Sequence, residues 1–184
     1  MKRQRFEVDD EGMAEMQMGR SPFSLAKELV SNFFDEDSVT EGKVTLRKDG
    51  NKPATLTVED NGNGFANIAD SWTLFRTTYK RERPDLRGRF NLGEKEILSI
   101  SSEATIESTE YKISFPRDGG RIVRKQKDGR KGTKLELQIN WTKADVEDCL
   151  KKLKQIIPPK KIKYFVNDQE VKPREPSKVV DCSL

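Results

Sequence analysis

The chain has 184 residues, of which 33% are hydrophobic and 36% charged; this suits one domain with a modest core, and no apolar run of about 18 residues offers a membrane-spanning helix. Its net charge of +4 mixes 35 basic with 31 acidic residues, a balance that permits nucleic-acid contact without indicating it. The absence of histidine and the presence of only two cysteines exclude Ser-His-Asp and Cys-His catalysis, histidine-ligated metals, a zinc site and a disulfide framework.

The N-terminal part of the sequence predicts a polar arm followed by a helix. Residues 1–20 are polar and rich in methionine, which suits an arm or a short helix. No apolar stretch follows the basic start, so we expect no signal peptide and a cytoplasmic location. Serine is a favoured N-cap and proline suits the first helical position, so a helix is expected to begin at Ser21-Pro22. Apolar residues at helical spacing extend this helix to about Glu36.

The remaining chain predicts strands joined by turns, with short helices between them. Alternating residues flank Asp49-Gly50, the signature of a β-hairpin. The charged segment 76–93 predicts a long loop. The expected strands are 43–48, 54–60, 103–108, 111–115, 121–126, 133–139, 161–166 and 170–172, and the expected helices are 68–75, 93–101 and one that begins at Thr142. This order predicts an α+β domain over 21–173, with helices on one face of a mixed sheet, and a polar tail over 174–184.

The first candidate site lies on the helix that begins at Ser21-Pro22. Glu28, Asn32 and Asp35 are spaced four and three residues apart, so they share one stripe beside the apolar face. A carboxylate and a carboxamide at this spacing could bind one Mg²⁺ and one water, with the glutamate taking a proton from the water. Spacing alone favours the simpler interpretation, the polar border of an amphipathic helix.

The second candidate site is the turn at the end of the strand 54–60. Asp60 leaves the strand into Asn-Gly-Asn-Gly, where its carboxylate could accept the exocyclic amine of adenine at the floor of a pocket. Gly62 and Gly64 would let the backbone approach the ring closely. A plain tight turn explains the same residues equally well.

Two further segments offer phosphate or base contacts. The loop that ends at Leu92 runs into a helix, and the amides of Gly93 and Glu94 would form an anion site near its start. The basic side chains that add positive charge there are Arg87, Arg89 and Lys95. Gly132-Thr133 opens the strand 133–139 and places a hydroxyl at its start. Walker and Rossmann glycine motifs are absent from the sequence, so neither a P-loop nor a dinucleotide fingerprint is present.

Taken in order, these four segments resemble the GHKL superfamily, whose Bergerat ATP-binding fold occurs in gyrase B subunits, heat-shock chaperones of the ninety-kilodalton class, histidine kinases and MutL. The resemblance spans about residues 21–140. The segments LAKELVSNFFDE and VEDNGNGF are most similar to MutL and type II topoisomerases. The sequence departs from the family at the lid, where Asn91 stands at the position of the middle glycine of G-x-x-G-x-G.

The resemblance implies a two-layer Bergerat sandwich with a mixed, mostly antiparallel sheet. It implies an Mg²⁺-dependent ATP-binding domain with slow hydrolysis, whose lid movement drives dimerisation or DNA-related work. Glu28 would be the general base, and Asn32 would hold Mg²⁺ between the phosphates. The remaining nucleotide contacts implied are Asp35, Asp60, Gly62, Gly64, Gly88, Arg89, Leu92, Gly93, Glu94, Lys95 and Thr133.

Two alternatives remain open from the sequence. The first is a non-catalytic nucleotide sensor or interaction module of the same fold, which regulates a partner protein. The second is a basic nucleic-acid-binding domain, for which a solvated helix face and hairpin is the simpler interpretation. Its basic residues are Lys151, Lys152, Lys154, Lys160, Lys161 and Lys163.

Overall fold

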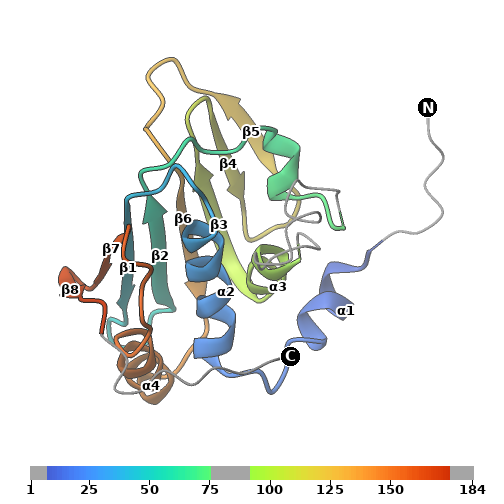
Figure 1. Ribbon diagram of the computed structural model, residues 1–184. Coiled ribbons are helices and arrows are strands. Elements are labelled where there is room, and N and C mark those ends of the chain that lie inside the picture. Colours follow the sequence, from blue (N-terminus) through green and yellow to red (C-terminus); the bar gives the residue numbers. More distant parts are fainter. Residues whose placement is uncertain (1–7, 76–91, 175–184) are drawn as a thin grey trace, which may run out of the picture.

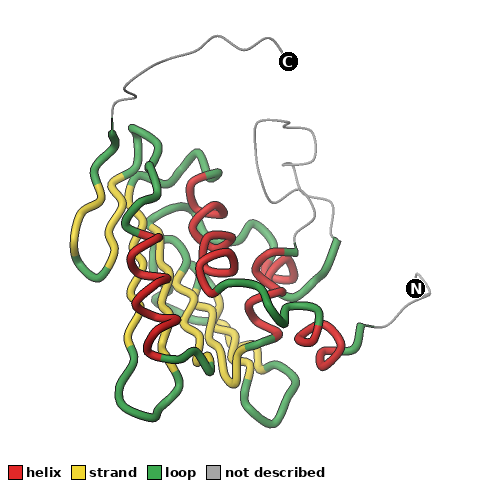
Figure 2. The backbone as a smooth tube through the Cα atoms, turned by 90° about the horizontal axis from the view of Figure 1, so that it is seen from below, coloured by secondary structure: helices red, strands yellow, loops and turns green. Residues whose placement is uncertain are grey.

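The computed structural model describes residues 8–75 and 92–174 and shows a single sheet with helices on one face (Figures 1 and 2). The sheet has eight strands in the order β5-β4-β3-β6-β2-β1-β7-β8. Neighbouring strands are antiparallel except β1 and β7, which run parallel. These two layers confirm the α+β sandwich with a mixed, mostly antiparallel sheet that the sequence predicts.

The elements follow the predicted order along the chain. The strands are β1 Glu41–Arg47, β2 Ala54–Asp60, β3 Ser101–Glu107, β4 Tyr111–Phe115, β5 Ile122–Lys125, β6 Lys134–Ile139, β7 Lys163–Val166 and β8 Gln169–Val171. The helices are α1 Asp10–Glu15, α2 Pro22–Phe34, η1 Ile68–Ser71, α3 Gly93–Ser99 and α4 Lys143–Leu153. Each predicted strand is present, with ends that differ by one or two residues.

Side-chain caps fix where the two longer helices begin. The Ser21 hydroxyl accepts the amide of Ser24 at the start of α2, and Thr142 and Asp145 form a reciprocal capping box at the start of α4. Both devices satisfy amides that have no partner within the helix. The apolar stripe of α2 buries Leu25 and Leu29, among others, against the sheet. The apolar stripe of this helix is therefore part of the hydrophobic core.

The strands alternate between the core and the open face. In β2, Leu56 and Val58 are buried beneath the helices, whereas Thr57 and Glu59 are half-exposed on the other side. The same alternation runs through β1 and β6, because successive side chains of a strand point to opposite faces. One face of the sheet is therefore hydrophobic and covered, and the other is polar.

The helix predicted over 68–75 is wrong in extent. Only one 3₁₀ turn forms, from Ile68 to Ser71, and the Asn67 side chain caps it. Trp72 then leaves helical geometry, and its ring lies against the guanidinium of Arg121, 4.8 Å from ring centroid to Cζ. Phe75 has a positive φ of 54°, which is incompatible with a continuing helix. Tertiary contact overrides local propensity here.

Substitution of Gly42 tests a close contact between α2 and β1. A Cβ at this position would lie 2.3 Å from the ring of Phe33, so α2 and β1 approach closely only because residue 42 is glycine. We expect Gly42→Ala to lower the free energy of unfolding by about 1–3 kcal/mol through overpacking, as measured by urea denaturation. An unchanged midpoint would contradict this packing of α2 on β1.

Candidate functional site

Asp60 ends β2 and organises the turn that follows it. Its Oδ1 accepts the amide of Gly62 at 2.8 Å and that of Thr133 at 3.4 Å. The backbone pairing of β2 with the chain before β6 supports this arrangement, since the Asp60 amide donates to the Thr133 carbonyl at 2.9 Å. Among the described residues, no hydrogen-bond donor reaches Oδ2. One carboxylate oxygen is thus held by backbone and the other is available to a ligand.

The electrostatic surroundings of Asp60 are unfavourable to its charge. Burial raises its pKa above the ordinary value of 3.8, and the amides of Gly62 and Thr133 offset this only in part. Arg130 also lowers the pKa, whereas the negative charge of Glu36 raises it. A half-buried carboxylate whose desolvation is only partly compensated gains from a hydrogen-bond donor supplied by a ligand.

The glycines of the turn let the backbone pass close to two neighbouring segments. A Cβ at Gly62 would lie 2.8 Å from Val39 Cγ2 and 3.0 Å from Ser38 Oγ. At Gly64, with φ of 74°, it would lie 2.4 Å from Ser108 Oγ. Both positions exclude larger residues by space, and Gly64 excludes them by backbone conformation as well.

Three residues that the sequence analysis did not single out hold this turn in place. Ser38 Oγ accepts the amide of Asn63 at 3.2 Å, and the buried Ser108 Oγ accepts that of Phe65 at 3.1 Å. The Asn61 carboxamide accepts the amides of Thr40 and Glu41, each at 3.0 Å. Serine and asparagine are common in turns, and nothing in their spacing indicates partners 20 to 43 residues away.

Glu28 lies on α2 where the helix meets the start of α3. A Cβ at Gly93 would lie 3.0 Å from Glu28 Oε2, so the absence of a side chain at Gly93 leaves room for the carboxylate. Glu28 and Asn32 are half-buried, and neither forms a hydrogen bond or ion pair within the part of the chain that the structure describes. Asp35 is the C-cap of α2. Of the three predicted side chains, Glu28 is the one that lies beside the start of α3.

The predicted anion site lies at the start of α3. Leu92 is its N-cap and no side chain caps the helix. The ammonium of Lys95, however, is buried and donates to the Asp70 carbonyl of η1, with Glu94 at 3.8 Å. Burial lowers the pKa of Lys95. Its contact with phosphates therefore stays a prediction, and Gly88, Arg89 and Asn91 lie outside the described residues.

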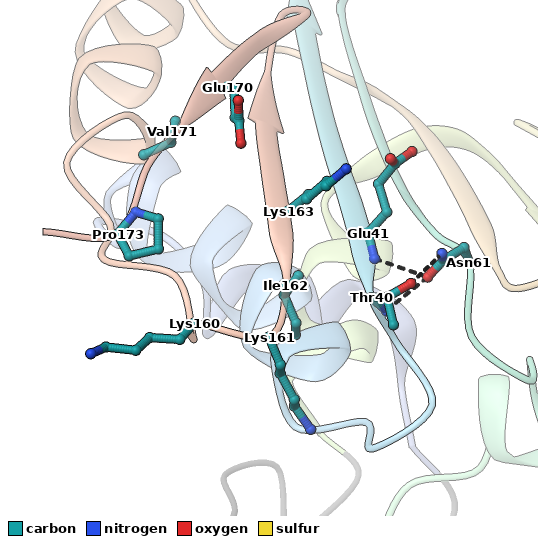
Figure 3. A pocket seen from close by; sticks show the side chains of 10 residues that line it. All are labelled: Thr40, Glu41, Asn61, Lys160, Lys161, Ile162, Lys163, Glu170, Val171 and Pro173. Carbon is teal, nitrogen blue, oxygen red and sulfur yellow. Dashed lines mark hydrogen bonds between the residues drawn. The ribbon is translucent and has the colours of Figure 1, made fainter.

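A separate hollow of about 340 Å³ opens beside the Asn61 hydrogen bonds, between β1, β7 and β8 (Figure 3). The side chains of Lys160 and Lys161 extend away from each other at its lower rim, and Lys161 pairs with Asp37 at 3.3 Å. Lys163 lies beside Glu41, its register partner on β1. Because its charges are mixed and divergent, this hollow is a poor phosphate site.

Three lysines of the nucleic-acid alternative, Lys152, Lys154 and Lys161, have local partners. Lys152 pairs with Asp148 at 2.7 Å, one turn earlier on α4. Lys154 donates to the Gln169 carboxamide at 2.8 Å. These contacts are typical of a solvated helix face.

Residues 8–75 and 92–174 contain neither a cluster of metal-ligating side chains nor a membrane-spanning helix. Histidine, cysteine, aspartate and glutamate side chains do not gather there in threes to hold a metal ion. No helix there is long and apolar enough to cross a bilayer.

Comparison with known proteins identifies the fold. The chain is similar to the ATPase region of Saccharomyces cerevisiae topoisomerase II, with a TM-score of 0.65 and 15% identity over 83% of this chain and 49% of that one. The same region bound to ICRF-187 (dexrazoxane) gives a TM-score of 0.64 at 15% identity, with the same coverage of 83% and 49%. The N-terminal domain of a DNA repair protein gives 0.56 at 15% identity, over 85% and 51% of the two chains. Neither a protein-family model nor a curated protein matches the sequence.

These likenesses confirm the two-layer α+β fold that the sequence predicts, which is shared with the ATPase region of topoisomerase II. The chain spans about half the length of the structures that it matches. The shared fold places α2, the Asp60 turn and the start of β6 in one framework. The fold alone does not identify a ligand for these elements.

Proposed function

We propose that this chain is an ATP-binding domain whose adenine site is centred on Asp60. The observation that carries the proposal is the state of that carboxylate: it is half-buried, its Oδ1 is held by two backbone amides, and its Oδ2 faces no donor from the described residues. The exocyclic amine of adenine would supply the missing donor. The likeness in fold to the ATPase region of topoisomerase II supports the same ligand.

The chemistry of Asp60 also predicts selectivity for the base. Adenine presents an amine at the position where guanine presents a carbonyl oxygen. An ionised carboxylate facing a carbonyl would place two hydrogen-bond acceptors against each other in a half-buried site, which is unfavourable. Gly62 and Gly64 would let the ring lie directly against the backbone, since neither carries a Cβ.

Glu28 and Asn32 are the residues that we propose to act on the phosphates. Mg²⁺ prefers one or two protein oxygens together with phosphate and water oxygens, which fits the Asn32 carboxamide and the lack of a preformed cluster of acidic ligands in the described chain. Bound there, the cation would neutralise phosphate charge. Glu28, half-buried beside Gly93, would accept the proton of the attacking water. We expect slow hydrolysis that drives dimerisation or DNA-related work.

The runner-up is a nucleotide sensor that binds ATP without hydrolysing it. One observation favours it: the Lys95 ammonium is engaged with the Asp70 carbonyl and not presented to phosphates. Both functions share the Asp60 site, so binding is tested first and phosphate release second.

The test of binding is a thermal-shift titration with Mg-ATP and Mg-GTP. Saturation at about one hundred times the dissociation constant should stabilise the fold by roughly 2.7 kcal/mol, or about 5–10 °C. We expect the ATP shift to be lost in Asp60→Asn, because a hydrogen bond to a charged group contributes about 1.5–3 kcal/mol, and GTP to give no shift. The control Asp49→Asn, at the exposed hairpin turn, should respond like the wild type.

The same variant should be at least as stable as the wild type without nucleotide. The folded pKa of Asp60 is raised, so its stabilising effect is complete below about pH 3.8 and is lost as the pH rises through the folded value. At neutral pH the ionised Asp60 therefore lowers the free energy of unfolding. Asparagine carries no charge and so avoids this loss, and its side-chain oxygen can still accept the Gly62 amide. A stable Asp60→Asn protein that still shifts with ATP would contradict the proposed site.

A further inference from the structure

β5 is the terminal strand of the sheet, and its outer edge pairs with no other strand of the described chain. The Gln126 amide donates to the Glu110 carbonyl at 2.7 Å, which fixes the alternation of hydrogen bonds along this pair. Counting back by twos, Arg124 and Ile122 exchange backbone bonds with β4. Val123 and Lys125 therefore direct their N–H and C=O groups outward, to the open edge.

The side chains of this edge are apolar as well as basic. Ile122 is 46% exposed and Val123 is 43% exposed. Val123 lies opposite the fully buried Ile113 in the register of β4 and β5, so the hydrophobic face of the sheet continues to the edge but is only half covered there. An apolar side chain on an added strand would cover Val123 and so continue the hydrophobic face.

Charges on the open face of the sheet alternate from strand to strand along one cross-strand row. The row is defined by register and runs from the β5 edge towards the centre of the sheet. In this order its members are Arg124, Lys112, Glu107, Lys134, Glu59 and Lys43. Lys112 pairs with Glu107 at 2.6 Å. Only the outermost step, Arg124 beside Lys112, joins like charges, which is unfavourable.

The positive charge of the β5 edge favours an acidic partner segment. Residues 121–127 contain four basic and no acidic side chains. Two copies of this strand would repel each other, which is a known way in which proteins avoid edge-to-edge self-association. A strand that places a carboxylate beside Arg124 would instead restore the alternation of the row. The cation–π contact between Arg121 and Trp72 holds the start of β5 against η1.

We propose that the β5 edge docks an extended acidic segment of a partner protein as a ninth strand. Its backbone would pair with Val123 and Lys125, and an acidic side chain would lie beside Arg124 while apolar ones cover Val123. This mode of recognition combines main-chain hydrogen bonds with side-chain selectivity. The surface lies at the opposite end of the strand order from β8 and is separate from the Asp60 turn.

The probe is a fluorescein-labelled eight-residue peptide in which glutamate and valine alternate, followed by fluorescence anisotropy on the whole chain. We expect saturable binding that Arg124→Glu weakens at least tenfold. Val123→Pro removes the outward N–H without touching the bonds to β4, and should weaken binding about tenfold. Lys143→Glu changes the charge equally at the exposed start of α4 and should bind within twofold of the wild type. Hydrogen exchange of the Val123 and Lys125 amides should slow when the peptide is bound.

Other outcomes would overturn the proposal. Equal binding of a peptide with N-methylated alternate amides would mean that charge alone attracts it. No binding of either peptide, or equal loss in Lys143→Glu, would remove the edge as a docking site. A mixed-sequence oligonucleotide that binds in place of the peptide, and is lost in Arg124→Glu, would make the surface a nucleic-acid contact. Thermal unfolding of both β5 variants shows whether they fold, and Arg124→Glu is expected to fold well because it removes the like-charge pair with Lys112.

Discussion

Glu28→Gln should lower phosphate release from Mg-ATP by about 10²–10⁴-fold and leave ATP binding within about threefold. General-base catalysis contributes rate enhancements of that size, and glutamine keeps the shape of the side chain while losing its basicity. The carboxylate has no hydrogen bond or ion pair within the described residues, so its removal breaks no structural contact there. The effect should therefore fall on the rate of hydrolysis and not on stability.

The measurement is phosphate release with enzyme in excess of ATP, beside a thermal-shift titration of the same variant. Glu147→Gln, on the exposed face of α4, makes the same chemical change away from the site and should hydrolyse ATP at the wild-type rate. If Glu28→Gln is as active as the wild type, Glu28 is not the base. If the wild type binds ATP but releases no phosphate above the blank, the sensor interpretation replaces the ATPase.

The sequence predicted the fold because its signals are local and agree with one another. Ser21, Pro22 and Thr142 mark helix starts that the structure confirms, and the strand alternation matches the covered and open faces of the sheet. The helix predicted over 68–75 fails for a tertiary reason, because Trp72 lies against Arg121, which is distant in sequence and directly precedes β5. No local pattern contains that contact.

At Asp60 both interpretations of the sequence describe the same atoms. Oδ1 closes the turn by accepting the Gly62 amide, which is the tight-turn interpretation. Oδ2 remains for a ligand, which is the binding interpretation. The residues that fix this turn from a distance, Ser38 and Ser108, could not be found from spacing because hydrogen bonds across folded segments leave no period in the sequence. For the same reason, the sequence did not predict that the Lys95 ammonium is buried and donates to the Asp70 carbonyl.

Gly132→Ala should lower the free energy of unfolding by at least about 3 kcal/mol, or roughly 6–12 °C in midpoint. Gly132 has φ of 79°, and a Cβ there would lie 2.0 Å from the Asp60 carbonyl oxygen and 2.7 Å from its carbon. Both atoms belong to backbone, so neither can move aside as a side-chain tip would. The measurement is urea denaturation with a thermal scan.

A matched variant separates the two causes of this loss. Gly119 also has a positive φ, of 92°, but a Cβ there meets nothing within 4 Å, so Gly119→Ala carries only the conformational penalty of about 1–2 kcal/mol. The difference between the variants measures the approach of Gly132 to Asp60. Equal losses would contradict that approach, and with it the Thr133 contact to Oδ1. A larger loss at Gly132, together with a weaker ATP shift, is the result expected if this glycine positions the chain that holds the Asp60 carboxylate.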